Sequence, residues 1–271
     1  MNSDQQKTGI LLAAFGTSVP GADHVYQDIQ DRVESAFPGC SIYWAYTSKV
    51  VREKLRDRSQ EALSPLQALG VMGEHGFCRA AVQSLLIIPG LEHHDLIRVC
   101  NHVQGLPKGL ERISLGDPLL CHSDDLEQFV LAMLENIPGD RAEDEAVIFM
   151  GHGSTHPANI YYAGLQYHFW LYDQKILVGA VEGTPDLDDV LLRLKKMNIK
   201  KALLMPLMVV AGDHALNDMA GRQTDSWLST LRSRGIEARV CMQGLGAFEN
   251  ITFIWLRHLQ RAMDALNPGS V

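Results

Sequence analysis

The chain has 271 residues, of which 46% are hydrophobic and 21% are charged. At roughly 100–200 residues per domain, this length suits one large or two small domains, and the composition excludes disordered, collagen-like and coiled-coil proteins. The 24 basic and 32 acidic residues give a formal net charge of −8, which argues against non-specific binding to nucleic acid or to an anionic membrane surface. An anionic ligand therefore requires a local basic surface.

Cysteine usage and hydropathy indicate the compartment. Five scattered cysteines, with no CxxC or zinc-knuckle spacing, are expected to be reduced and mostly buried: Cys40, Cys78, Cys100, Cys121 and Cys241. The apolar run at 203–211 is far shorter than the ~20 residues of a membrane span, and the polar segment 1–9 lacks a signal-peptide core. This pattern favours a cytoplasmic protein, although a periplasmic chain whose export signal has been removed would look the same.

The first half alternates short apolar runs with helical patterns. The run at 9–15 stops at Gly16-Thr17-Ser18, which is typical of a central parallel strand. We then expect a helix carrying Val25, Ile29 and Val33, a strand at 41–46, a basic helix from about Ser48, a helix at 65–74 and a strand at 80–88. Strands that alternate with helices predict a parallel α/β sheet.

The second half repeats this series, with expected strands at 146–150, 176–181 and 203–211. The turn at 151–154 ends its strand as Gly16-Thr17-Ser18 ends the first. His152 stands 135 residues after Thr17, and Glu182 stands 135 residues after Thr47. Three matched strand ends in one order make chance similarity the weaker explanation. We predict two similar parallel-sheet α/β domains, residues 1–140 and 141–271, joined in the polar stretch 138–145 and with a cleft between them.

Three strands of the second half end in chemically notable residues, His152, Glu182 and His214. Ligands of parallel α/β sheets bind at the carboxyl ends of the strands. Two imidazoles and one carboxylate form a three-ligand site with open positions, which suits a divalent ion such as Co, Ni, Fe or Zn. The alternative is that each is an ordinary polar residue of a solvated loop. The first half has Thr17, Thr47 and Glu92 at the matching places, so only one half would hold the metal.

Two acidic residues flank His214 on a helix expected from Asp213 to about Met219. Asp213 is placed as the N-cap of that helix. Asp218 is a candidate for orienting the imidazole of His214, the less favoured of these two roles.

Other segments offer candidate ligand contacts. Six of the 19 aromatic residues follow the turn at 151–154, and most are expected in the core while some are candidates to face a flat ligand: Tyr161, Tyr162, Tyr167, Phe169, Trp170 and Tyr172. Segment 49–58 has five basic and two acidic residues. It is either a solvated helix face or, through Arg52 and Arg56, a site for ligand carboxylates. His93 and His94, expected in an exposed loop, are candidates for a second metal or the iron of a haem.

Three segments resemble the ATP-independent anaerobic cobaltochelatases, the sirohydrochlorin cobaltochelatase family related to ferrochelatase: FMGHGSTH (149–156), VGAVEGTPDLD (178–188) and LLMPLMVVAGDHALNDMAG (203–221). The segments AAFGTS (13–18), TSKVVREKLR (47–56) and LSPLQAL (63–69) fit as well, so the resemblance covers nearly the whole chain. It implies the class II chelatase fold and places the metal ligands of the family at His152, Glu182 and His214. The segment LEHHD (91–95) departs from the more acidic sequence of other members, which leaves an additional ligand or assembly role open.

The resemblance implies that the protein inserts Co2+ into sirohydrochlorin on the way to cobalamin, with Fe2+ or Ni2+ as other candidate metals. Candidate substrate-binding residues are Arg52, Arg56, Thr17, Thr47 and Glu92. No nucleotide is needed, and the sequence has no Walker motif and no GxGxxG turn. A metal or haem carrier without turnover is the alternative, and metal-dependent hydrolysis ranks last because HExxH is absent. No nucleic-acid or membrane partner is expected, and a homo-oligomer is left open.

Overall fold

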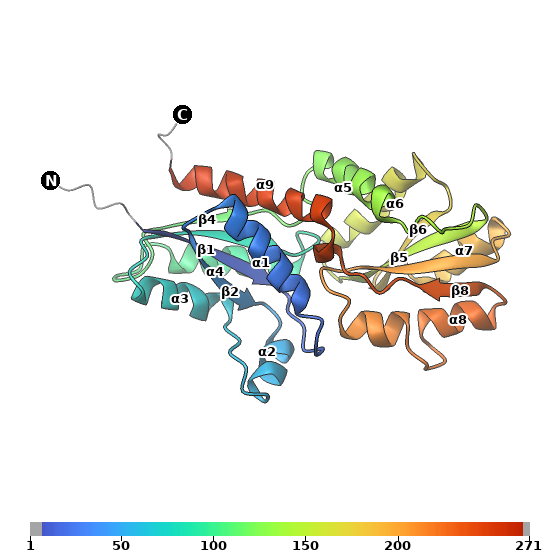
Figure 1. Ribbon diagram of the computed structural model, residues 1–271, viewed down its shortest axis with the longest axis horizontal. Coiled ribbons are helices and arrows are strands. Elements are labelled where there is room, and N and C mark those ends of the chain that lie inside the picture. Colours follow the sequence, from blue (N-terminus) through green and yellow to red (C-terminus); the bar gives the residue numbers. More distant parts are fainter. Residues whose placement is uncertain (1–6, 268–271) are drawn as a thin grey trace. The chain divides into compact units, whose positions relative to one another are not determined.

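The computed structural model describes residues 7–267, and its strands form two four-stranded parallel sheets (Figure 1). The first sheet has the order β2-β1-β3-β4 and the second the order β6-β5-β7-β8. The strands are β1 (Thr8–Ala14), β2 (Ser41–Tyr46), β3 (Arg79–Leu85), β4 (Arg112–Gly116), β5 (Glu145–Gly153), β6 (Ile176–Glu182), β7 (Lys201–Leu207) and β8 (Glu237–Val240). The same strand order in both sheets confirms the predicted pair of similar parallel α/β units.

Helices connect consecutive strands, as parallel pairing requires. Those of the first half are α1 (His24–Ala36), α2 (Lys49–Arg56), α3 (Pro65–Glu74), α4 (Leu91–Val103) and α5 (Ser123–Asn136). The second half has η1 (Pro157–Asn159), α6 (Ile160–Trp170), α7 (Leu187–Lys196), the π-helical turn η2 (Ala215–Met219), α8 (Trp227–Ser233), η3 (Leu245–Ala247) and α9 (Glu249–Leu266). No helix in the range 7–267 has the length and apolar character needed to cross a membrane.

The chain passes between its two compact units more than once. Of the described residues, the first unit contains 7–18, 26–121 and 253–267, and the second contains 19–25 and 122–252. The predicted boundary near residue 140 differs from this division, because α5 belongs with the second unit and most of α9 with the first. Two hydrogen bonds hold the end of α9 in the first unit: Arg112 Nη2 donates to the carbonyl oxygen of Ala265 at 3.4 Å, and Arg79 Nη1 donates to Oδ1 of Asn267, directly after the helix, at 2.6 Å. A periodic pattern in α9 predicts a buried face and does not say which sheet buries it.

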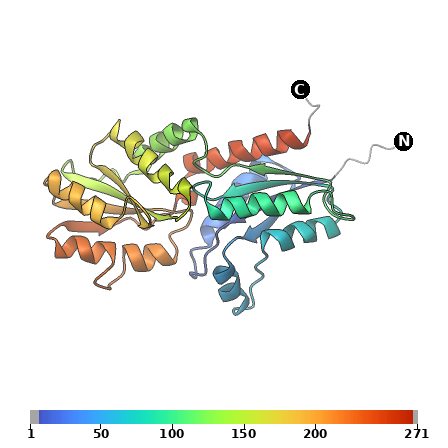
Figure 2. The same cartoon turned by 180° about the vertical axis from the view of Figure 1, so that it is seen from behind.

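Both faces of the first sheet are covered, which explains its continuous apolar strands. Leu11 and Ala13 of β1 point toward α3 and α4, where Leu69 and Leu96 are buried. Successive side chains of a strand alternate between faces, so the residues between them, such as Leu12, point to the other face. Figure 1 shows α1 in front of these strands, and Figure 2, from behind, shows α4 in front of them.

The second sheet is covered in the same way. Ile148 and Met150 of β5 pack with α7, α8 and η2 in one cluster. On the opposite face Phe149 stacks on Phe169 of α6, with ring centroids 5.0 Å apart, and Phe169 meets Phe129 of α5 edge to face. This packing fixes β5 in the centre of the sheet, between β6 and β7.

Most of the predicted helices and strands are present, and three expectations differ from the structure. β3 ends at Leu85 and β7 at Leu207, so the apolar residues that follow belong to turns before the next helix. His93 and His94 lie on α4, not in a loop. Among the cysteines only Cys100 is buried and the other four are half-buried, so the expectation of mostly buried cysteines is wrong. Part of the polar N-terminal segment, residues 1–6, lies outside the described residues.

Candidate metal centre

The proposed ligands occupy the carboxyl ends of three adjacent strands of the second sheet. His152 is the last residue but one of β5, and Glu182 is the last residue of β6. The parallel register pairs Gly153 with Glu182, which sets His152 and Glu182 at the same edge. β7 pairs with the other side of β5, and His214 follows it by seven residues. The strand order brings the carboxyl ends of β6, β5 and β7 to one edge of the sheet, and metal binding there stays a prediction.

The imidazole of His152 has a defined tautomer. Its Nδ1 lies 3.1 Å from the carbonyl oxygen of Gly153. Because a carbonyl oxygen only accepts hydrogen bonds, Nδ1 carries the proton. In the neutral ring the lone pair is then on Nε2, which is the form that binds a metal ion.

His214 is oriented by a carboxylate. Its Nδ1 lies 2.6 Å from Oδ2 of Asp218, at i+4 within the turn that contains η2. The carboxylate accepts the Nδ1 proton and leaves the Nε2 lone pair of His214 available for a metal, the arrangement found around many metal-bound histidines. The sequence favoured Asp213 as the N-cap, but His214 occupies that position without a side-chain cap. Asp213 instead accepts a hydrogen bond from Asn217.

The two imidazoles lie against each other. Their ring centroids are 4.6 Å apart and their planes are nearly perpendicular, at 87°. Both rings are half-buried, whereas Glu182 is exposed. The structure therefore brings His152 and His214 into direct contact and holds Glu182 on the neighbouring strand end. Two nitrogen donors and one carboxylate at an accessible edge suit a borderline divalent ion that must also leave.

The glycines on either side of His152 are required by close packing. A Cβ added to Gly153, whose φ is +82°, would lie 1.6 Å from the carbonyl oxygen of Glu182. A Cβ at Gly151 would lie 2.3 Å from the ring of Tyr162, whose buried hydroxyl accepts a hydrogen bond from the Gly153 N–H at 3.3 Å. Burial raises the pKa of Tyr162 to about 12. The GHG motif thus positions His152 by bringing its strand against Glu182 and Tyr162.

Asn159 is a site residue that sequence reasoning missed. Its Oδ1 accepts from the Ser154 N–H at 3.0 Å, and its Nδ2 donates to the carbonyl oxygen of Thr184 at 2.7 Å. One side chain therefore joins the loop that follows His152 to the loop that follows Glu182. No local pattern identifies this role, because the two partners lie on different strands' loops.

The matching positions of the first unit contain no comparable set. Thr17 is buried after β1, and Thr47 follows β2, with its N–H donating to the carbonyl oxygen of Ala14 at 2.8 Å. Glu92 lies in the first turn of α4. Two hydroxyls and one carboxylate lack the nitrogen donors of the second unit. The prediction that only one half holds the metal follows from this difference, and the substrate contacts expected of these residues stay predictions.

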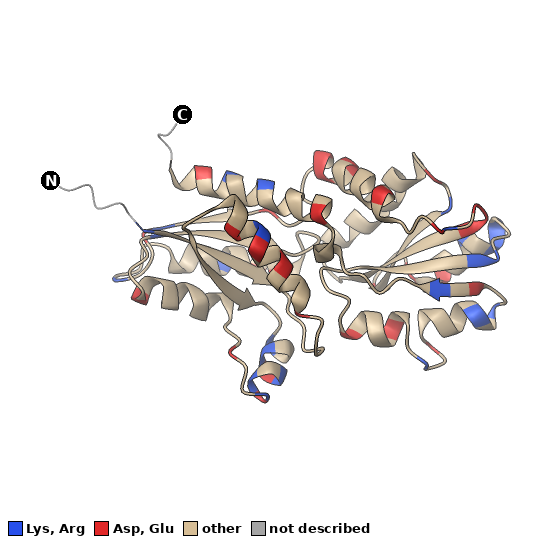
Figure 3. Ribbon diagram, in the orientation of Figure 1, with Lys and Arg blue, Asp and Glu red and all other residues tan. Residues whose placement is uncertain are grey.

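The predicted carboxylate-binding arginines make contacts within the first unit. Arg52 Nη1 donates to the carbonyl oxygens of Tyr46 and, at 2.6 Å, of Thr47. Arg56 Nη2 donates to Ala62 at 3.0 Å. Burial and the charge of Arg56 lower the pKa of Arg52. The coloured ribbon in Figure 3 has both acidic and basic positions on α2. Arg52 therefore braces the end of β2 and Arg56 the segment before α3, and their contact with a substrate stays a prediction.

His93 and His94 differ in their surroundings. His93 is only 5% exposed, and its Nδ1 lies 3.1 Å from Ser84 Oγ. Burial lowers its pKa, and the nearby Asp117 carboxylate partly opposes this. His94 is exposed, with Nδ1 2.9 Å from the carbonyl oxygen of Gly90. The expectation of a loop is wrong for both histidines, because they lie on α4, and the expectation of exposure is wrong for His93, which the helix places in the core.

Two of the six aromatic residues after His152 lie in the core, so the expectation that most of them are buried is wrong. Tyr162 and Phe169 are buried, while Tyr167 and Tyr172 are exposed. Trp170 is half-buried, with the guanidinium of Arg193 over its ring.

A hollow of about 450 Å³ has mainly apolar walls and includes two residues that follow β7. It is lined by Ala22, His24, Val25, Val210, Ala211, Cys241, Met242, Gln243, Gly244 and Ala247.

Comparison with known proteins supports the resemblance. The family model described as cobalt chelatase (CbiK) matches residues 8–264. The sirohydrochlorin cobaltochelatase CbiKC of Nitratidesulfovibrio vulgaris is 38% identical over 263 residues, which cover 96% of this chain and 92% of that protein. The sirohydrochlorin cobaltochelatase of Salmonella typhimurium is 35% identical over 267 residues, covering 95% and 97%.

The fold is also shared with a solved structure. SirB from Bacillus subtilis with Fe3+ superposes with a TM-score of 0.64 at 14% identity, covering 96% of this chain and 97% of SirB. The expected chelatase fold is thereby confirmed. With the family match over nearly the whole chain, the conclusion is direct: this chain belongs to the cobalt chelatase (CbiK) family.

Proposed function

We propose that this protein is a sirohydrochlorin cobaltochelatase that inserts Co2+ into the tetrapyrrole without ATP. Family membership and the names of two relatives support the reaction. The main support for the site is the contact of His152 with His214, in which each Nδ1 is held by an oxygen acceptor, so that the neutral ring carries its metal-binding lone pair on Nε2.

Metal insertion requires two kinds of exchange. The ion must exchange its protein and water ligands for four ring nitrogens, and two pyrrole N–H groups must lose their protons. His152, His214 and Glu182 hold the incoming Co2+ as substrate through nitrogen and oxygen donors. A thiolate set would bind a borderline ion too tightly for release. The absence of a cysteine from this ligand set therefore suits a site that delivers its metal.

His214 is the better proton acceptor of the two histidines. As Co2+ leaves Nε2 of His214 for the ring nitrogens, the freed lone pair takes a pyrrole proton, and the ring becomes an imidazolium whose Nδ1–H already points to the Asp218 carboxylate. A carboxylate in this position stabilises the cation that forms. The partner of His152 is the neutral carbonyl of Gly153, which stabilises a cation less. Glu182, exposed at the end of β6, passes protons to solvent and offsets the charge of the ion.

The decisive experiment follows insertion by absorbance with sirohydrochlorin and Co2+, Fe2+ or Ni2+. We expect the wild type to accelerate cobalt insertion over the spontaneous reaction and His152→Ala to lose most of that acceleration. His168→Ala, which removes a half-buried histidine of α6, is the matched control. Unchanged activity in His152→Ala would overturn the ligand assignment while leaving the reaction in place.

The same assay separates the enzyme from a carrier of the same fold. A carrier binds the metal or the tetrapyrrole and gives no acceleration over the spontaneous rate. If the protein leaves the rate unchanged with all three metals, the enzyme proposal fails. The relative rates with the three ions identify the preferred metal.

Four expectations extend this proposal. We place the protein in the cytoplasm, keep a homo-oligomer open, and assign ligand carboxylates to Arg52 and Arg56. His93 and His94 are the candidates for a haem or a second metal, and a Soret band in the purified protein checks the haem.

A further inference from the structure

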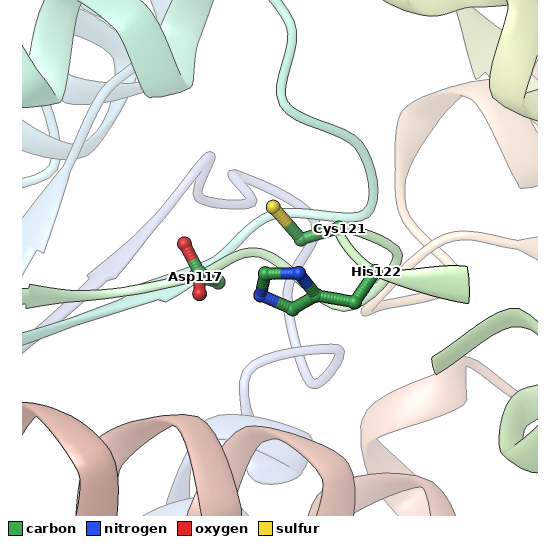
Figure 4. A group of neighbouring side chains, drawn as sticks. All are labelled: Asp117, Cys121 and His122. Atoms are coloured by element: carbon green, nitrogen blue, oxygen red, sulfur yellow. The ribbon is translucent and has the colours of Figure 1, made fainter. Parts of the chain in front are cut away.

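A second group of metal-ligating side chains lies in the segment that joins β4 to α5. Asp117, Cys121 and His122 each offer one ligand atom, and these atoms all lie within 4.8 Å of one another. Figure 4 shows the His122 ring turned toward the Asp117 carboxylate, with the Cys121 sulfur beside them. All three belong to six consecutive residues, so the geometry of the group is local to this segment.

The backbone of the segment is held in place at both ends. The N–H groups of Leu119 and Leu120 donate to the carbonyl oxygens of Leu86 and Ile87, at 2.9 and 2.8 Å. These bonds tie the segment to the residues that follow β3. At its other end the His122 N–H donates to Asp125 Oδ2 at 2.9 Å, in the first turn of α5.

The carbonyl oxygen of Asp117 is held as well. It accepts from Gln83 Nε2 at 2.9 Å and lies 3.1 Å from Nδ1 of His258. The side chains of Asp117, Cys121 and His122 therefore project from an ordered backbone. Only their rotamers need to adjust for the ligand atoms to close on an ion, which lowers the cost of forming a site.

The size of that adjustment is small. A tetrahedral ion with bonds of about 2.3 Å to sulfur and about 2.0–2.1 Å to nitrogen and oxygen separates its ligand atoms by about 3.3–3.6 Å. Starting separations within 4.8 Å thus require movements on the order of 1 Å. Asp117 and Cys121 are half-buried and His122 is exposed, so an ion from solvent can reach the group.

We propose that Asp117, Cys121 and His122 bind one thiophilic divalent ion, of the Zn2+ class, separately from the substrate metal. Sulfur, nitrogen and carboxylate oxygen are the ligands typical of such sites. The thiolate distinguishes this group from His152, Glu182 and His214, since it holds a borderline ion tightly and suits a resident ion. Its effect is structural, because it fastens the segment between β4 and α5.

Cobalt is the probe that separates the two sites. We expect Co2+ titrated into the metal-free full chain to produce a sulfur-to-cobalt charge-transfer band in the near ultraviolet, saturating at one ion per chain. The His152 site has no thiolate and produces no such band. Added Zn2+, which has a filled d shell, competes for the site and removes the band.

Variants assign the band to residues. Cys121→Ser abolishes it, whereas Cys40→Ser, a change at another half-buried cysteine, leaves it intact. His152→Ala also keeps the band, although the chelation site is damaged. Asp117→Asn and His122→Ala weaken Zn2+ competition by more than the about 10–100-fold typical of losing an outer-shell partner. Absence of the band in wild type, its survival in Cys121→Ser or its loss in His152→Ala would each overturn the proposal.

Thermal unfolding distinguishes the loss of the metal site from the loss of the fold. Because the ion binds only the native chain, excess Zn2+ raises the Tm of the wild type and of Cys40→Ser. Cys121→Ser, folded by circular dichroism, shows a smaller rise, because only the site of His152, Glu182 and His214 is left to bind Zn2+. A Zn2+-dependent rise of equal size in Cys121→Ser would also overturn the proposal. None of these readouts depends on tetrapyrrole turnover, so the metal site and the chelatase reaction fail or succeed independently.

Discussion

Oδ2 of Asp218 lies 2.6 Å from Nδ1 of His214, with both side chains partly exposed at 43% and 36%. The pair lies at i and i+4 around η2, so one short segment supplies both the metal donor and the group that orients it. π-helical turns are rare and often occur at functional sites. The contact also gives His214 a counter-charge for the proton that metal insertion releases.

Replacing Asp218 with Asn should therefore weaken the site more than the fold. We expect a loss of about 10–100-fold in Co2+ affinity or insertion rate, with the effect divided between KM for Co2+ and kcat. Steady-state insertion kinetics measure both. Asp213→Asn is the matched control, because Asp213 lies on the same segment and its carboxylate accepts a hydrogen bond from Asn217. Equal kinetics for the two variants would contradict the orienting role.

Gly153→Ala should damage both stability and activity. The added Cβ would lie 1.6 Å from the Glu182 carbonyl oxygen, and the φ of +82° disfavours any L side chain. The conformational cost alone is about 1–2 kcal/mol, before the strand shifts to relieve the contact. Thermal unfolding and the insertion assay measure the two effects. Gly139→Ala, where a Cβ meets nothing within 4 Å, should leave both unchanged.

Asn159→Ala should separate the loop after His152 from the loop after Glu182. Two hydrogen bonds are lost, at about 1–2 kcal/mol in a partly exposed position, and the insertion rate falls because the ligands lose their relative placement. Asn159→Asp keeps the acceptor for Ser154 and loses the donor to Thr184, so an intermediate rate is expected. A rate in Asn159→Ala equal to wild type would show that strand pairing alone places the ligands.

Acid stability should depend on the ion pair of Glu145 with Arg239. Arg239 Nε and Nη2 donate to the Glu145 carboxylate at 2.7 and 2.9 Å. These bonds hold the pKa of Glu145 below its ordinary value, although burial opposes the shift. A lowered native pKa stabilises the fold above the unfolded pKa of Glu, about 4.3, and this stabilisation is lost as the pH falls through the native value.

Arg239→Ala should therefore lower the free energy of unfolding by about 3 kcal/mol at pH 7, since it removes the charged partner of a buried carboxylate. The difference in free energy of unfolding between this variant and the wild type should shrink as the pH falls below about 4, where Glu145 becomes protonated. Urea unfolding at pH 7 and pH 3.5 checks both. Lys201→Ala, which breaks the exposed pair with Asp144, should change stability little. A constant difference between Arg239→Ala and wild type across this pH range would refute the linkage.

The sequence by itself determined several of the elements and the order of the strands. Apolar runs of strand length that stop at glycine predicted β1 and β5, and the helix expected at 65–74 coincides with α3. Local patterns suffice here because the burial of one face leaves a period in the sequence. The repeat of three strand ends also placed His152, Glu182 and His214 at one edge, since parallel strands with the same order end on the same side.

Only the tertiary structure decided which side chains meet. It gave His214 the partner Asp218, joined two loops through Asn159, engaged Arg52 with the backbone of its own unit and buried His93. It also packed most of α9 with the first unit. Hydrophobic periodicity reports that a face is buried and carries no information about the partner, which depends on pairing between residues far apart in the chain. For that reason the sheet edge that carries the proposed metal donors followed from the sequence, and their orientation did not.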